Sequence, residues 1–293
     1  MSTLYDISLQ ITYSYDSPAG SSRTLLRMQP RTLPDQQLIS GFVGTDPLPE
    51  FRRDGVDFFG NGTTEVTHGQ ALSEIVFRFD GRVRRNPGPA PLDLSTSLER
   101  LDHEIAAVRG LGWESPHHYL SDSDRVGHDP EIAAFARDTI ASGMSTMGAV
   151  QAVSQALHRE MAFDPVATDV STPPIEAFRT RRGVCQDFSH IMIAALRSVG
   201  IPAGYVSGFL RTIPPEGQER LEGADAMHAW VQAWCGAETG WIQIDPTNDM
   251  LAGADHVTVA LGRDYADVAP VKGSHRTAGR HTTMHQVDVV PVR

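Results

Sequence analysis

The sequence has few cysteines and little positive charge, and both scarcities limit what the chain can be. Cys185 and Cys235 are the only cysteines among 293 residues, too few for a disulfide framework in a chain of this size. We therefore expect two free thiols. Lysine and arginine number 25 against 36 aspartates and glutamates, which gives a formal net charge of −11. This charge would repel phosphate backbones and anionic lipids, so we expect no nucleic acid and no membrane partner.

Long apolar runs are also missing. No stretch approaches the roughly 18 to 20 apolar residues that a membrane-spanning helix needs. The opening sequence MSTLYDISLQITYSY has no basic segment followed by an apolar block, as a secretion signal would have. We therefore expect a cytoplasmic protein. Apolar residues still make up 40% of the chain, which is enough for a buried core in one large or two modest domains.

The first part of the chain is predicted to form strands. Apolar or aromatic side chains alternate with mostly polar ones, the pattern of a strand with one buried face, at Tyr5, Ile7, Leu9, Ile11 and Tyr13 and again at Ile75, Phe77 and Phe79. A proline-rich stretch over 84–95 then separates the strand-like pattern from the helical pattern that follows. We predict an antiparallel β-sandwich domain over residues 1–90.

The remaining residues, 91–293, are expected to combine a helical layer with a sheet and a C-terminal β segment. Asp129 directly before Pro130 is typical of a helix N-terminus. Helical and strand patterns predict helices over 130–141, 146–161 and 185–198, and strands over 203–211, 228–234 and 240–246. The fold class predicted for the whole chain is α+β.

Cys185 follows Gly183-Val184 at the start of a predicted helix. A lone cysteine is usually a small core residue. At a helix N-terminus, however, unpaired backbone N–H groups and the helix dipole favour the thiolate, which is the nucleophilic form. Gly183 is expected to let the backbone turn sharply and to leave the sulfur accessible.

A thiol nucleophile needs a base, normally a histidine, and a third group that orients the ring. His228 opens the strand HAWVQAW, and Asp245 closes the strand WIQID. Two antiparallel strands joined by a short turn would place a residue at the start of one beside a residue at the end of the other. We therefore expect His228 and Asp245 to be cross-strand neighbours, or nearly so.

The motifs GVCQDFSH, MHAWVQAW and WIQIDPTND, in this order, resemble those of the transglutaminase-like superfamily of papain-type thiol enzymes. The resemblance implies a papain-like core preceded by a β domain, with Cys185 as nucleophile, His228 as general base and acid, and Asp245 as its orienting partner. It also implies acyl transfer on peptide or carboxamide bonds through a thioester, by a cysteine protease or amidase (a hydrolase) or by an acyltransferase. We expect a protein or peptide substrate and neither a metal nor another cofactor.

Several neighbouring residues have competing interpretations. An oxyanion donor could come from Gln151 or Gln155, and the sequence does not choose between them. His190 points to another side of the helix from Cys185 and is expected to be structural, whereas Asp187 is expected to cap the helix.

Other positions are assigned to packing or turns. Trp230 is expected near the site, Cys235 in the core, and Asn248 in a turn rather than in the site. The C-terminal histidines are expected to belong to a solvated polar arm, at positions 275, 281 and 285. A non-catalytic protein-binding scaffold that has kept the fold is the alternative function. The presence of all three triad residues favours the enzyme.

Overall fold

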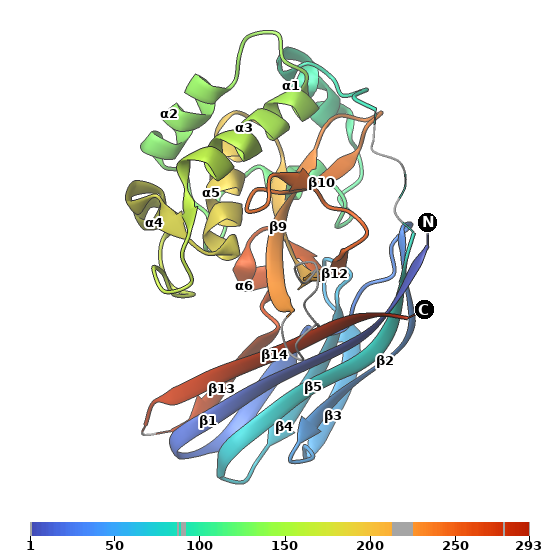
Figure 1. Cartoon of the computed structure of the whole chain (residues 1–293), viewed down its shortest axis with the longest axis vertical. Coiled ribbons are helices and arrows are strands. Elements are labelled where there is room, and N and C mark those ends of the chain that lie inside the picture. Colours follow the sequence, from blue (N-terminus) through green and yellow to red (C-terminus); the bar gives the residue numbers. More distant parts are fainter. Residues whose placement is uncertain (1, 87, 89–91, 213–224, 278, 293) are drawn as a thin grey trace, which may run out of the picture.

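The computed structural model places a helical and sheet core on top of a long β domain (Figure 1). It describes every residue except 1, 87, 89–91, 213–224, 278 and 293. Within that described part, no helix is long and apolar enough to cross a membrane.

Seven antiparallel strands form the β domain. They are β1 (Thr3–Leu26), β2 (Gln36–Asp46), β3 (Phe51–Val56), β4 (Gly62–His68), β5 (Leu72–Arg85), β13 (Val271–Arg276) and β14 (His281–Val292). The first part of β1 pairs with β5 and β14, and its second part pairs with β4 and β13. β2 and β3 add outer strands to β5 and β4. The strand β1 therefore joins two antiparallel layers.

The alternation along β1 follows the predicted pattern. Tyr5, Ile7, Leu9 and Ile11 are buried, whereas the intervening residues Asp6 and Ser8 are exposed. Residues from β5 complete the same core, among them Phe77, Phe79 and Val83. The mixed α and β composition and this N-terminal β domain agree with the predicted fold class.

Both ends of the chain build the β domain, which the sequence analysis missed. The C-terminal histidines at 275, 281 and 285 lie in β13 and β14, which pair with β1, so the expectation of a solvated arm was wrong. Val287 and Val289 alternate inward and are buried, because one face of β14 covers the same core as β1. The predicted domain boundary between residues 90 and 91 lies outside the described residues.

The core contains the helices of the described residues, a five-stranded sheet and the two-stranded pair of β6 and β7. Its elements are α1 (Leu98–Ala107), η1 (Pro116–Tyr119), α2 (Pro130–Thr139), α3 (Thr146–Glu160), β6 (Ala162–Phe163), α4 (Pro174–Thr180), β7 (Arg182–Gly183), α5 (Cys185–Ser198), β8 (Ala203–Leu210), β9 (Ala226–Trp234), β10 (Trp241–Asp245), β11 (Met250–Leu251), β12 (His256–Gly262) and α6 (Tyr265–Val268). The five-stranded sheet has the antiparallel order β11-β10-β9-β8-β12. The helix and strand predictions for this half are confirmed, including Asp129 as the cap of α2.

Helix α5 is the central element of the core. It packs against β8 and β9 and is contacted by α2, α3 and α4, and residues 186–196 are all buried. A helix that is buried on every side needs apolar residues around its whole circumference, as Ile191, Met192 and Ala195 illustrate. The helix ends before Gly200, whose φ of 81° suits glycine. Cys185 is thus fixed at one end of a rigid helix.

The β domain covers the free edge of the core sheet. Gln36 exchanges hydrogen bonds of 2.7 and 2.8 Å with the backbone carbonyl and N–H of Thr258 on β12. Asn61 does the same with Leu261, at 2.8 Å in both directions. Side-chain amides therefore replace the missing neighbouring strand and satisfy backbone groups that an edge strand would leave unpaired.

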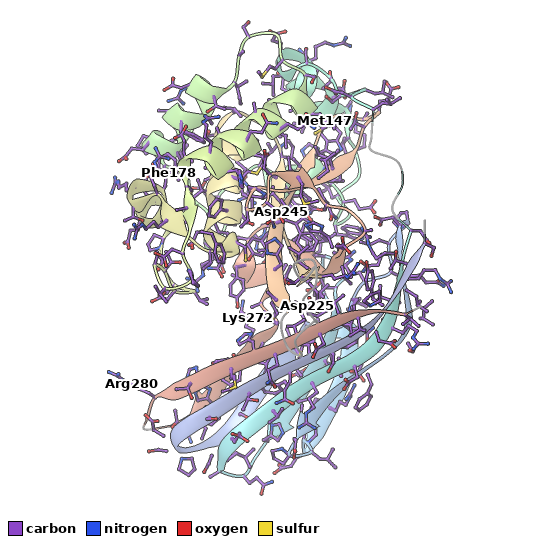
Figure 2. The ribbon with its side chains drawn as sticks, in the orientation of Figure 1. Met147, Phe178, Asp225, Asp245, Lys272 and Arg280 are labelled. Atoms are coloured by element: carbon purple, nitrogen blue, oxygen red, sulfur yellow. The ribbon has the colours of Figure 1, made fainter. Side chains whose placement is uncertain are left out.

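A third contact joins the two sheets at the start of β9. The Asp225 carboxylate accepts the backbone N–H of Thr212 and that of Val289 on β14, both at 2.6 Å. Asp225 lies at the junction between β9 and β14 in Figure 2. The strand that carries His228 is therefore anchored to the β domain near its first residue.

Candidate active site

The structure brings Cys185, His228 and Asp245 together from three elements. Cys185 is the first residue of α5 and is partly exposed. His228 lies near the start of β9, and Asp245 is the last residue of β10. Because Ile244 pairs with Val231, Asp245 is a diagonal rather than a direct cross-strand neighbour of His228.

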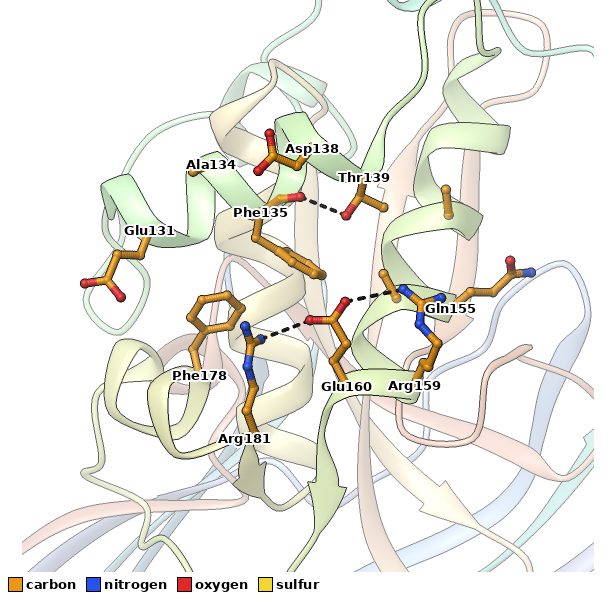
Figure 3. Close-up of a pocket in the computed structure, with 12 residues that line it drawn as sticks. Glu131, Ala134, Phe135, Asp138, Thr139, Gln155, Arg159, Glu160, Phe178 and Arg181 are labelled. Atoms are coloured by element: carbon orange, nitrogen blue, oxygen red, sulfur yellow. Dashed lines mark hydrogen bonds and ion pairs between the residues drawn. The ribbon is translucent and has the colours of Figure 1, made fainter.

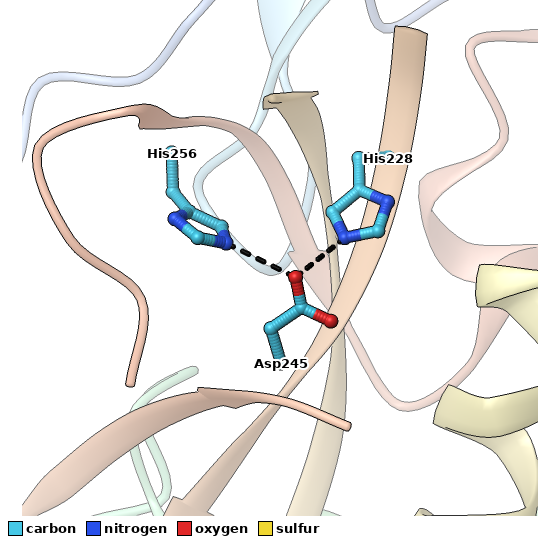
Figure 4. Close-up of side chains that lie close together, drawn as sticks. All are labelled: His228, Asp245 and His256. Atoms are coloured by element: carbon cyan, nitrogen blue, oxygen red, sulfur yellow. Dashed lines mark hydrogen bonds and ion pairs between the residues drawn. The ribbon is translucent and has the colours of Figure 1, made fainter. Parts of the chain in front are cut away.

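The His228 ring lies between the carboxylate and the thiol. Its Nε2 is 2.6 Å from Asp245 Oδ2 (Figure 4). Burial lowers the pKa of His228, but the hydrogen bonds and charges of Asp245 and Cys185 outweigh burial and raise this pKa to about 10. The ring is therefore an imidazolium at neutral pH. Because Nε2 bonds Asp245, Nδ1 is the ring nitrogen left for the hydrogen bond with Cys185.

The carboxylate of Asp245 is completely buried and accepts five hydrogen bonds. Oδ2 accepts from His228, from Asn248 Nδ2 at 2.7 Å and from His256 Nε2 at 3.2 Å. Oδ1 accepts the backbone N–H groups of Thr247 and Asn248 at 2.9 and 3.2 Å. Burial raises the pKa of Asp245, but the donors on Oδ2 more than offset it, so the pKa lies below its usual range.

Two of these donors differ from the sequence predictions. Asn248 was assigned to a turn, but its side chain also bonds the Asp245 carboxylate and lies 3.5 Å from His228 Nε2, so it belongs to the site. The sequence analysis missed His256 altogether. Its position at the start of a strand after a glycine-containing turn gave no signal, because the contact with Asp245 depends on tertiary packing.

His228, Asp245 and His256 are the described residues whose ligand atoms could hold a metal ion, since these atoms lie within 4.8 Å of one another. Both histidines, however, direct Nε2 at the same carboxylate oxygen over hydrogen-bonding distances. A metal ligand needs a free lone pair on nitrogen, and a nitrogen that donates N–H to a carboxylate has none. The geometry fits a hydrogen-bonded network better than a metal site.

Asp187 holds the start of α5, as the sequence predicted. Its Oδ2 accepts the backbone N–H of Val184 at 2.8 Å and the hydroxyl of Thr168 at 2.6 Å. Burial raises the pKa of Asp187, which these two hydrogen bonds only partly counteract. With Val184 satisfied, the backbone N–H of Cys185 remains unpaired among the described residues, as expected in the first turn of a helix.

Gly183 has a different role from the one predicted. Its φ is not positive, and a Cβ at this position would lie 2.6 Å from Asp187 Oδ2 and 2.8 Å from Asp187 Cβ. The glycine is therefore required by the close approach of Asp187 rather than by a sharp backbone turn.

Gly183→Ala is expected to lower the free energy of unfolding by about 1–3 kcal/mol, the cost of inserting a methyl group into a packed site. It should also slow turnover, because the displaced Asp187 no longer holds the N-terminus of α5. Urea unfolding and peptide turnover check both effects. Gly112→Ala is the matched control, since a Cβ there meets open space; an equal loss in both variants would contradict the prediction.

Three neighbouring residues behave as the sequence suggested. His190 is buried, accepts the backbone N–H of Tyr265 at 3.2 Å and is kept neutral because burial lowers its pKa to about 4. Trp230 is buried with its ring centre 6.1 Å from that of His228, and its Nε1 donates to Gln243 at 2.9 Å. Cys235 is a buried free thiol whose pKa is raised by burial to about 12.

Among the described residues, neither Gln151 nor Gln155 hydrogen-bonds Cys185, His228 or Asp245. Gln155 is exposed and lines a groove of about 750 Å³ between α2, α3 and α4 (Figure 3). The backbone N–H of Cys185 is the donor that the structure positions at the thiol.

Comparisons with known proteins agree with the fold. A family model described as the transglutaminase-like superfamily matches residues 133–246, and one described as the bacterial transglutaminase-like N-terminal region matches residues 5–84. Uncharacterised proteins of Mycobacterium bovis and Mycobacterium leprae are 30% and 31% identical over 98% and 95% of this chain, and the matches cover 92% and 94% of their own lengths.

A solved structure from Cytophaga hutchinsonii, described as a candidate cysteine protease, has the same fold. It superposes with a TM-score of 0.78 at 18% identity, over 100% of this chain and 92% of that chain.

Proposed function

The chain belongs to the transglutaminase-like superfamily, and on this premise we propose that it catalyses thiol-dependent acyl transfer on peptide or carboxamide bonds, with Cys185, His228 and Asp245 as its catalytic triad. One observation carries the proposal: the His228 ring lies between a partly exposed thiol at a helix N-terminus and a buried, fully hydrogen-bonded carboxylate. The substrate class is a protein or peptide.

The first half of the reaction forms a thioester. The thiolate of Cys185 attacks the substrate carbonyl carbon, a C–S bond forms, and the carbonyl oxygen becomes an oxyanion that the backbone N–H of Cys185 can stabilise. As the tetrahedral intermediate collapses, the C–N bond breaks and His228 gives its proton to the departing amine or ammonia. Asp245 keeps the ring oriented throughout.

The second half releases the acyl group. Water or a primary amine attacks the thioester carbonyl while His228 accepts a proton from it, and the C–S bond breaks to restore the thiolate–imidazolium pair. Water gives a carboxylic acid, which is hydrolysis by a protease or amidase. An amine gives a new amide, which is transglutamination. Both outcomes use the same three residues.

The alternative of a non-catalytic scaffold has a specific difficulty. Burying an ionised carboxylate is costly unless donors satisfy it, and Asp245 uses five donors for this purpose. A scaffold has no need of a buried charge beside an imidazolium and an accessible thiol. The arrangement is better explained by chemistry.

Mass spectrometry of peptide libraries, offered with and without a primary amine, tests the proposal. The native protein should give cleaved or deamidated peptides, or peptides that have incorporated the amine, and Cys185→Ser should give none. The balance between the products distinguishes hydrolysis from transfer. Equal product yields from the native protein and Cys185→Ser, or no product from a native protein that remains folded, would overturn it.

A further inference from the structure

Among the triad residues, Asp245 is the one that His256 hydrogen-bonds, and the His256 ring centre lies 6.2 Å from that of His228. The Nε2 of His256 is 3.2 Å from Asp245 Oδ2 (Figure 4), and its side chain is only 1% exposed. On the other side of the ring, Nδ1 accepts the backbone N–H of Gly253 at 3.2 Å. An imidazole nitrogen that accepts a hydrogen bond carries no proton, so in the neutral ring the proton lies on Nε2. Gly253 therefore fixes the tautomer that donates to Asp245.

The turn that contains Gly253 is held by the β domain. Arg85, at the end of β5, donates from Nη2 to the carbonyl of Gly253 at 2.9 Å and from Nη1 to Asp35 at 2.9 Å. The Arg85 side chain is only 4% exposed. Tyr5, on β1, donates its hydroxyl to Asp255 at 2.9 Å in the same turn. Two residues of the β domain thus fix the backbone that orients His256.

We propose that His256 is a positioning residue that locks the Asp245 carboxylate, and that the β domain supports catalysis through the hydrogen-bonded series Arg85, Gly253, His256 and Asp245. The proposal rests on the proposed function, because the atom that it ultimately positions is the catalytic imidazole. The hydrogen bonds of the His256 ring go to Asp245 and Gly253, so it acts by restricting where Asp245 Oδ2 can lie.

The position of that oxygen matters because it decides how the His228 ring faces the thiol. Misplacing a catalytic group by about 1 Å can cost roughly 100-fold in rate. Asn248 and the backbone of the 246–248 turn hold Asp245 from its own side. His256 holds it from β12, a strand separated from β10 by β9 and β8 in the sheet order. Without His256, only the residues of this turn hold the carboxylate, apart from the His228 ring that the carboxylate itself has to position.

Two substitutions of His256 separate positioning from folding. His256→Gln places an amide N–H near the former Nε2, so it can still donate to Asp245. His256→Asn places an amide oxygen near the former Nδ1, so it can still accept from Gly253 but cannot reach Asp245. We expect His256→Asn to lower kcat by roughly 10- to 100-fold with little change in KM, and His256→Gln to restore most of that loss. Equal kcat in the two variants, or losses that follow their thermal unfolding temperatures, would overturn the proposal.

Substitution of Arg85 tests the connection to the β domain. Arg85→Met removes the donor to Gly253, and Arg82→Met is its matched control because Arg82 lies on the same strand but forms an exposed ion pair with Asp6. We expect Arg85→Met to lower kcat several-fold and Arg82→Met to leave it unchanged. In the double variant with His256→Asn, the loss should be no greater than that of His256→Asn alone, because residues acting through one network are not additive. If the losses of kcat in Arg85→Met and His256→Asn add in the double variant, the two residues do not act through one hydrogen-bonded series, and the proposal fails.

Two further measurements, on Tyr5→Phe and on the alkylation of Cys185, apply if Arg85→Met does not fold or if kcat alone does not identify which proposal has failed. If Arg85→Met does not fold, Tyr5→Phe removes a single hydroxyl contact to the same turn and should lower kcat to a smaller extent; no loss would count against the proposal. Iodoacetamide labelling of Cys185 then identifies which idea has failed. If His228→Ala does not slow labelling, the proposed triad fails; if it does but His256→Asn has no effect on kcat, only the role of His256 fails.

Discussion

Asp245→Asn is expected to lower kcat/KM by about 10⁴-fold, the effect of neutralising the carboxylate that orients a triad histidine. An amide has no charge to stabilise the His228 imidazolium, whose pKa would fall from its raised value of about 10. Histidine would then be neutral over more of the pH range and could offer the thiol the wrong tautomer. Peptide turnover followed by mass spectrometry measures the loss.

The same substitution should also destabilise the fold, because no orientation of an amide suits this position. Oδ2 is surrounded by side-chain donors from His228, Asn248 and His256, and Oδ1 by the two backbone N–H groups of the following turn. Whichever of the two positions the amide NH₂ occupies, it meets N–H groups that need an acceptor. Each buried group left without a partner in this way costs about 1–3 kcal/mol.

Urea unfolding measures this second loss, and Asp6→Asn serves as the control. Asp6 is an exposed carboxylate paired with Arg82, and a surface pair of this kind contributes little to stability. Asp6→Asn should leave turnover intact. A variant of Asp245 that unfolds like the native protein and keeps a tenth of its activity would contradict the mechanism.

Local patterns in the sequence were sufficient to predict most of the core. Helix α2 begins where Asp129 caps the first backbone N–H groups and Pro130 needs no donor of its own. Helix α5 was predicted close to its observed bounds, because apolar residues at helical spacing are followed by Gly200 and Pro202. These signals involve residues within one turn of one another, so no knowledge of the tertiary fold is needed to interpret them.

Features that depend on distant packing could not be predicted in this way. His256 bonds Asp245 although β12 pairs with β8 and not with β10, so no rule about neighbouring strands connects the two residues. The polar composition around His275 and His281 concealed β13 and β14, which form because β1 offers them backbone partners. Asn248 satisfied a turn pattern and a site contact at once, and the sequence showed only the first.

His228→Ala is expected to reduce kcat by about 10⁶-fold and to slow iodoacetamide labelling of Cys185 at pH 6 by roughly 10- to 100-fold. Both effects have one cause: without the imidazolium, the thiolate loses its counterion and the leaving amine loses its proton donor. Mass spectrometry of the labelled protein reports Cys185 separately from Cys235, which is buried and should remain unlabelled. His190→Ala is the control, because His190 lies on α5 with Cys185 but is kept neutral in the core. Equal slowing of the labelling in both variants would contradict an ion pair between Cys185 and His228.

The pH dependence of turnover by the native protein should report the titration of His228. The pKa of His228 is raised from 6.5 to about 10, so turnover should decline as the pH rises towards 10, where the imidazolium loses its proton. The stability contributed by the His228–Asp245 pair has the same sign. It is complete below pH 6.5, where the unfolded histidine is also protonated, and it is lost as the pH rises through the folded value of about 10. The difference in the free energy of unfolding between the native protein and His228→Ala should therefore shrink from pH 6 to pH 10, and a difference that grew over this range would show that His228 is neutral in the folded protein.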